Sequence, residues 1–163
     1  MRRHVRVFGA AAVLAVVASW SGALAAQSKD DPFIGRWILD RAKSEFSGAP
    51  PERRTAVFEL MPDGSIKHVT ETVIANGSTD RVEYAYKYDG KDNPIQNSFM
   101  STVSVKRINP RTNERTGKVR GEVVETSTRT VSADGKTLTI TITGNNDGNE
   151  YSSSQVFRKE SEK

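Results

Sequence analysis

The chain has 163 residues, with 24 Lys and Arg, 20 Asp and Glu, two His and no Cys. Without cysteine it can form no disulfide, no thiolate metal site and no lipid anchor through an N-terminal Cys. The formal net charge of +4 falls to +1 once the three arginines of residues 1–25 are set aside, which leaves 21 basic residues against 20 acidic ones. A nucleic-acid partner needs a clustered basic face, so we expect none.

Residues 1–25 have the pattern of a secretory signal peptide. Three arginines lie among the first six residues, an uncharged apolar run extends from residue 7 to residue 20, and Ala23-Leu24-Ala25 is a small-x-small cleavage signal. The apolar run is shorter than the roughly 20 residues that span a bilayer. We therefore expect cleavage between Ala25 and Ala26, export to the periplasm or the extracellular space, and no membrane span in the mature chain. Both the Sec and the twin-arginine routes stay open.

The mature chain begins with a polar linker at residues 26–31, and residues 32–160 are enough for one domain. A short turn of helix is expected at residues 32–35, before a first strand at residues 36–40. The Ser-Gly-Ala-Pro-Pro run at residues 47–51 ends the helix-tolerant stretch that precedes it. No later segment shows a sustained helical repeat of apolar residues.

From residue 55 onward, Asp-Gly and Asn-Gly pairs recur at intervals of roughly a dozen residues, a spacing typical of hairpins. Between them apolar and polar residues alternate, most clearly at Leu138, Ile140 and Ile142. A loop is expected at residues 91–98, because Pro94 disfavours a central strand. Further strands are predicted at residues 55–61, 66–74, 81–88, 99–108, 112–119, 122–131, 136–143 and 151–159. The fold class is therefore all-β: an antiparallel up-and-down meander that closes into a barrel of about 8–10 strands.

Gly35-Arg36-Trp37, at the start of the first predicted strand, resembles the Gly-x-Trp signature of lipocalins and related calycin barrels. The segments at residues 88–92 and 131–139 also resemble a group of small exported bacterial lipocalin-like proteins of undefined activity. The resemblance implies that Gly35 and Trp37 close one end of the barrel. It also implies that a basic residue from the last strand covers the Trp37 ring, and Arg158, with Lys159 beside it, is the expected residue.

Few residues suited to catalysis follow the predicted signal peptide. His68 is the one histidine left and lies in phase with the inward positions of its strand, so we expect a hydrogen-bonded polar group rather than a base. We expect no metal, no cofactor and no enzymatic activity. The acidic residues, Glu125 among them, are out of phase with the apolar positions of their strands, and most are expected on the solvent face. The basic segment at residues 106–120 is expected to form a solvated hairpin.

The row of tyrosines at Tyr84, Tyr86 and Tyr88 can either line a pocket or fill the interior. We predict a monomeric barrel that binds a small apolar or amphipathic molecule in its lumen. The expected wall residues are those that alternation turns inward: Phe58, His68, Tyr84, Tyr86, Val103 and Phe157. The alternative is a structural or interaction module of the cell envelope with a filled core, favoured if no connected void exceeds ~300 Å³. A cofactor-free enzyme that uses His68 or the tyrosines is a third hypothesis.

Overall fold

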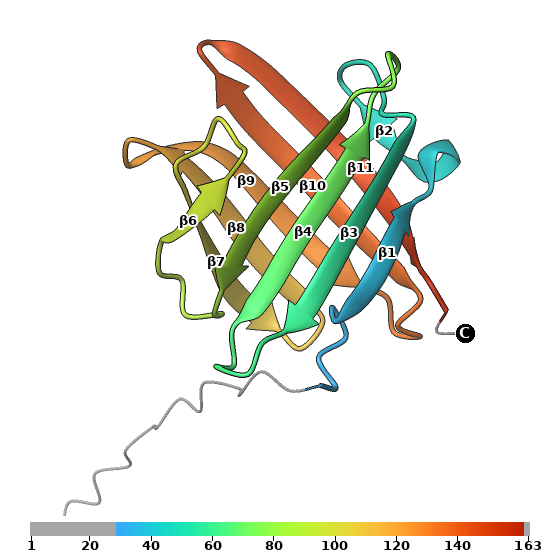
Figure 1. Ribbon diagram of the computed structural model, residues 1–163, viewed down its shortest axis with the longest axis vertical. Coiled ribbons are helices and arrows are strands. Elements are labelled where there is room, and N and C mark those ends of the chain that lie inside the picture. The colour runs from blue at the N-terminus through green and yellow to red at the C-terminus, as the bar shows by residue number, and fades with distance from the viewer. Residues whose placement is uncertain (1–28, 162–163) are drawn as a thin grey trace, which may run out of the picture.

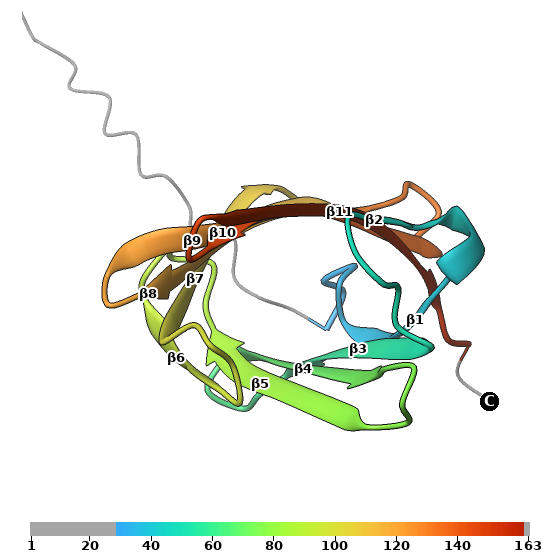
Figure 2. The same cartoon turned by 90° about the horizontal axis from the view of Figure 1, so that it is seen from above.

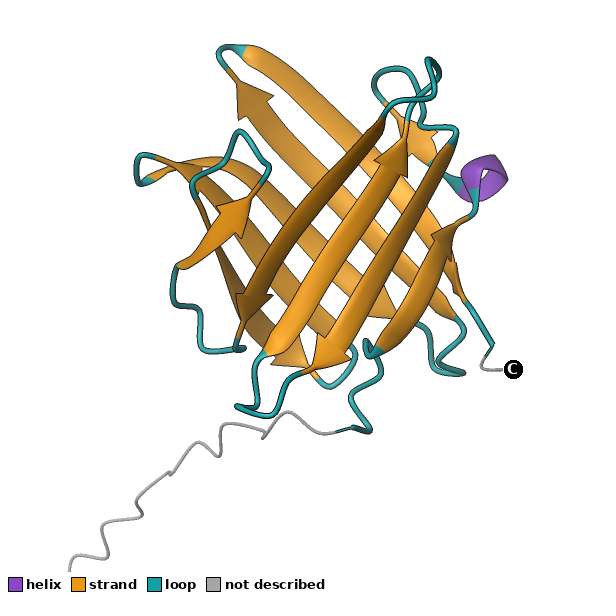
Figure 3. Cartoon of the chain, viewed as in Figure 1, coloured by secondary structure: helices purple, strands orange, loops and turns teal. Residues whose placement is uncertain are grey.

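The computed structural model describes residues 29–161, which form an antiparallel meander closed into a ten-stranded barrel with an added short strand, β2 (Figures 1 and 3). The elements are β1 (Gly35–Leu39), the 3-10 helix η1 (Arg41–Lys43), β2 (Glu45–Phe46), β3 (Arg53–Leu60), β4 (Ile66–Val73), β5 (Thr79–Tyr86), β6 (Asn93–Gln96), β7 (Thr102–Asn109), β8 (Thr112–Val119), β9 (Glu122–Val131), β10 (Thr137–Asn146) and β11 (Asn149–Lys159). The all-β barrel predicted from the alternation is confirmed.

The barrel closes because the first strand pairs with the last. β1 lies between β3 and β11, with Trp37 opposite Lys159 and Leu39 opposite Phe157. Viewed from above, the strands form a ring in which β3 and β4 lie opposite β9 and β10 (Figure 2). β2 adds a two-residue pairing to β11, outside the ring order. Closure removes the open edges that an antiparallel sheet of this size would otherwise expose.

The loop predicted at residues 91–98 is wrong in part, because it contains the short strand β6. Pro94 lacks a backbone N–H and cannot donate in a ladder. The pairing is accordingly narrow: two residue pairs join β6 to β5 and two join it to β7. By contrast, β10 and β11 pair over ten positions. Proline thus limited the length of this strand without preventing it.

The residues before β1 form a turn that leads the chain into the barrel. Pro32 and Phe33 form the turn in which Ile34 N donates to Asp31 O at 3.0 Å, at the position where a turn of helix was expected. The predicted leader and the first part of the predicted linker lie outside the described residues. Within residues 29–161, no helix has the length and apolarity to cross a membrane.

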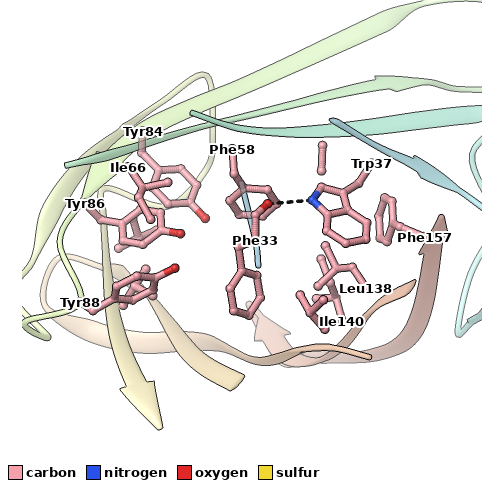
Figure 4. Packing of buried hydrophobic residues seen from close by; sticks show 14 of the residues in the cluster. Phe33, Trp37, Phe58, Ile66, Tyr84, Tyr86, Tyr88, Leu138, Ile140 and Phe157 are labelled. Carbon is pink, nitrogen blue, oxygen red and sulfur yellow. Dashed lines mark hydrogen bonds between the residues drawn. The ribbon is translucent and has the colours of Figure 1, made fainter. Parts of the chain in front are cut away.

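The closed end of the barrel is filled by an aromatic plug, formed by Phe33, Trp37 and Phe157. Each of these residues is at most 1% exposed, and Trp37 Nε1 donates to Phe33 O at 2.8 Å (Figure 4). Beside the plug, the Asp31 carboxylate is ion-paired with Arg107, whose guanidinium carbon lies 3.6 Å from the centroid of the Tyr88 ring. The indole N–H and the two charged groups at this end therefore have partners within the fold.

The expectation that Arg158 covers Trp37 is wrong, and Lys159 takes that place. Lys159 Nζ lies 5.2 Å from the Trp37 ring centroid, whereas Arg158 is exposed. Arg158 directly follows the inward-facing Phe157, so strand alternation turns it outward. Gly35 lies at φ +127, and a Cβ there would be 2.9 Å from Lys159 Cε. The lysine thus uses space that a side chain at position 35 would occupy.

Candidate ligand-binding site

Three arginines extend into the barrel interior beyond the aromatic plug. Arg54 lies on the inward face of β3 together with Ala56, and Arg129 lies on the inward face of β9 together with Val131. Arg115 on β8 is 5% exposed. Side chains alternate along a strand, so these positions place three guanidiniums inside the ring.

Of the three arginines, Arg129 has the fewest hydrogen-bond partners. It is 3% exposed, and its Nη2 donates to the Tyr84 hydroxyl at 2.6 Å. Its Nε and Nη1 have no hydrogen-bond partner, and it forms no ion pair with any residue in the range 29–161. Asn113, directly opposite Arg129 on β8, also leaves both amide atoms without a partner among these residues. Buried polar groups in this state are rare because each one loses its hydration.

Arg115 is held by an acidic partner. It is ion-paired with Glu125, which also accepts a hydrogen bond from the Tyr151 hydroxyl at 2.8 Å. On its other side, Nη2 of Arg115 lies 3.6 Å from Met100 Sδ. The Glu125 side chain is only 12% exposed, so it is an exception to the solvent-face position predicted for most of the acidic residues.

Arg54 is held by neutral groups. Its Nε donates to Thr72 Oγ1 at 3.0 Å, and its Nη1 donates to Gln155 Oε1 at 2.8 Å. Burial lowers the pKa of Arg54 from its ordinary value, and the charge of Glu125 opposes that shift. Arginine stays protonated in proteins, and Arg54 forms no ion pair of its own within residues 29–161.

These side chains surround an interior cavity of about 170 Å³. The polar part of its wall includes the three arginines, Glu125 and His68, and the apolar part is formed by Ala56, Val82, Ile140, Ile142 and Phe157. One carboxylate faces three guanidiniums, so two positive charges lack a counter-charge in the wall. The cavity is thus apolar on some sides and strongly cationic on others.

His68 is neutral in this setting. Burial, together with the charges of Arg129 and Arg115, holds the pKa of His68 well below its ordinary value. Its Nε2 lies 3.2 Å from Thr70 Oγ1, and its Nδ1 has no partner among the described residues. A catalytic triad needs a carboxylate to orient the imidazole, and these contacts supply none.

The predicted wall residues divide into two groups. His68, Tyr84 and Phe157 line the cavity. The others, Phe58, Tyr86 and Val103, are buried in the packed interior and do not line it. Phe58 stacks on His68 with ring centroids 4.2 Å apart, which places it behind the imidazole.

Sequence reasoning missed the burial of Arg115 and Arg107 because it treated the charges of residues 106–120 as solvated. Arg115 is buried and the Arg107 side chain is 19% exposed, so that prediction is wrong for both. The signal for Arg107 was present, since it is in phase with the buried Val103 and Val105. Arg115 had no such signal, because its inward-facing neighbours on β8 are an asparagine and a glycine rather than large apolar residues.

A larger hollow of about 640 Å³ lies at the strand ends near the β10–β11 hairpin. Most of the residues around it are exposed, including Val123, Thr126 and Asn145. It is therefore a surface depression rather than an enclosed site. Within residues 29–161, no group of three or more His, Cys, Asp or Glu is placed to hold a metal ion.

Comparison with solved structures identifies the fold. The fluorescent protein UnaG in its wild-type form is 16% identical, with a TM-score of 0.52 over 78% of this chain and 97% of that chain. A single-substitution mutant of UnaG is also 16% identical, with a TM-score of 0.53 over 81% and 99% of the two chains. The chain has the lipocalin-like calycin barrel fold. At these identities the likeness concerns the fold alone.

A zebrafish ileal bile acid-binding protein complexed with cholic acid is a weaker match, 12% identical with a TM-score of 0.47 over 79% of this chain and 99% of that chain. The sequence matches no protein-family model and no curated protein. The functional interpretation of this barrel therefore rests on its own interior.

Proposed function

We propose that the barrel binds a small amphipathic molecule in its lumen and holds an anionic group of that molecule at Arg129. The observation that supports this proposal most directly is the buried guanidinium of Arg129. It has two nitrogens without hydrogen-bond partners and no carboxylate partner among residues 29–161. Removing a charge from water costs several kcal/mol unless a partner compensates it. An anionic ligand supplies that compensation through charge-assisted hydrogen bonds.

The alternative is a module whose core is simply filled. The cavity of about 170 Å³ lies below the ~300 Å³ expected of a pocket for a drug-sized ligand, which favours this alternative. A core that serves packing alone, however, gains nothing from three guanidiniums in its interior beside one carboxylate. The charge of the wall thus supports a binding site for a ligand smaller than that range.

Calorimetric titration tests the proposal with two ligands of similar shape, benzoate and the neutral benzyl alcohol. We expect benzoate to bind at least about tenfold more tightly, because only it carries a charge for Arg129. Arg129→Met should abolish this preference, and Arg158→Met, at an exposed position, should retain it. Equal binding of the two ligands, or an unchanged preference in Arg129→Met, would contradict the proposal.

We also propose that this binding takes place outside the cytoplasm, on the basis of the leader pattern of residues 1–25. Cell fractionation followed by N-terminal sequencing tests this. A mature chain that begins at Ala26 and is found outside the cytoplasm is the expected result. An intact N-terminus on cytoplasmic protein would overturn the localisation and leave the binding proposal unaffected.

A further inference from the structure

Glu125 supplies the one carboxylate among the described residues that line the interior cavity, and it lies between two glycines. On the adjacent strands it pairs with Gly117 of β8 and with Gly144 of β10. A Cβ at Gly144 would collide with the Tyr151 ring, and a Cβ at Gly117 would collide with Met100 Sδ. The two glycines thus leave room for the side chains that surround Glu125.

These surroundings hold the Glu125 carboxylate on Arg115. One carboxylate oxygen is ion-paired with Arg115 Nη1, and the other accepts a hydrogen bond from the Tyr151 hydroxyl at 2.8 Å. The side chains of the ion pair are only 6% and 12% exposed. A ligand anion at Arg115 would have to displace Glu125 and leave that carboxylate buried without its partner, which is strongly unfavourable. Arg115 is therefore closed to an anionic ligand as long as Glu125 is in place.

The charge of Glu125 also reaches Arg54. Burial lowers the pKa of Arg54 and the charge of Glu125 opposes that shift, so the carboxylate partly compensates this second guanidinium. Arg129 is in a different position. It bonds the neutral Tyr84 hydroxyl, has two nitrogens without partners and forms no ion pair within residues 29–161. The negative charge of the cavity wall thus compensates Arg115 and Arg54 and leaves Arg129 available.

We infer that Glu125 determines which arginine receives the anionic group of the ligand, because it blocks Arg115 and directs that group to Arg129. This inference rests on the proposed function and adds the residue that sets its specificity. Glu125 acts through Arg115 and is a positioning residue. Without the charge of Glu125, Arg115 becomes a second guanidinium that can form charge-assisted hydrogen bonds to the ligand. Recognition of the anion should then no longer depend on Arg129 alone.

Calorimetric titration with benzoate and benzyl alcohol tests this dependence in combined variants. Arg129→Met alone should bind the two ligands equally. Adding Glu125→Gln to it should restore a preference for benzoate of at least about tenfold, and further addition of Arg115→Met should remove that preference again. The matched control adds Glu114→Gln to Arg129→Met. Glu114 is exposed on β8, so this control should bind both ligands equally.

A measurement on the unmodified protein decides the inference even where a combined variant does not fold. In its NMR spectrum, benzoate should shift the side-chain Nε–Hε signal of Arg129 clearly more than that of Arg115. Shifts of equal size at the two arginines, or no restored preference in a folded Glu125→Gln, Arg129→Met protein, would overturn the inference and leave the proposed function standing. A benzoate preference that persists in Arg129→Met alone, or no binding of benzoate, would overturn both.

Discussion

Buried polar groups have partners in one half of the barrel interior and lack some of them in the other half. At the closed end, the Asp31 carboxylate is ion-paired with Arg107, and the Trp37 indole N–H donates a hydrogen bond to a backbone carbonyl. In the cavity half, Arg129 is equally buried but has two nitrogens without partners among the described residues. A polar group that is satisfied internally stabilises a fold, whereas an unsatisfied one lowers stability and is available to a ligand. The closed end thus supports folding, and the cavity half is suited to binding.

The largest effect should come from the aromatic plug. Trp37→Ala removes a fully buried indole and its hydrogen bond to Phe33. We expect a loss of about 3–5 kcal/mol in the free energy of unfolding, measured by urea denaturation. A loss below about 1 kcal/mol would show that the closed end does not depend on this ring.

A smaller loss should follow from breaking the ion pair beside the plug. Asp31→Asn leaves Arg107 without its acidic partner, and we expect a loss of about 3 kcal/mol. Glu160→Gln is the control, because its pair with Arg36 is 47% exposed on both sides and should contribute less than about 1 kcal/mol. Equal losses in the two variants would remove the distinction between a buried and a surface pair.

The pH dependence of stability should reveal the cationic cavity through His68. Its pKa is lowered in the folded state, so below the ordinary value of 6.5 the unfolded chain binds a proton that the folded protein does not. Stability should then fall by up to about 1.4 kcal/mol per pH unit as the pH drops below that value. Thermal or urea unfolding at two values, about pH 7 and about pH 5.5, measures the loss, which should be smaller in His68→Gln. The same loss in both proteins would contradict this assignment.

The smallest expected effect is a gain in the free energy of unfolding rather than a loss. Arg129→Met replaces an unpaired buried charge with an apolar side chain, and we expect a gain of about 1 kcal/mol in stability. The gain is limited because the Tyr84 hydroxyl loses its hydrogen bond. Urea denaturation without ligand measures it. A loss of several kcal/mol would place Arg129 among the groups that stabilise the fold.

Much of the fold was predictable because the relevant signals are local. Alternation at Leu138 and Ile140, the turn pairs and the Gly35-x-Trp37 motif all act within a few residues. β6 was missed because a proline outweighed a pairing that only the tertiary structure provides. The position of Lys159 over Trp37 follows from strand parity, a local rule that the expectation for Arg158 did not apply.

The site was less predictable because its contacts join distant parts of the chain. Arg129 and Tyr84 are 45 residues apart in sequence, and Arg54 and Gln155 are 101 apart. Alternation indicates that Arg129 shares a face with Val131, but not which groups lie across the barrel from it. Only the closed ring shows that Arg129 and Arg54 face one cavity without carboxylate partners of their own.

The side-chain NMR signal of Arg129 Nε–Hε reports directly on the proposed anion anchor when the protein is titrated with benzoate. We predict that this signal shifts to saturation at the concentrations that saturate the calorimetric titration, while the signal of the exposed Arg53 stays in place. An Arg129 signal that does not move while the ligand binds would contradict the assignment of this arginine as the anion anchor.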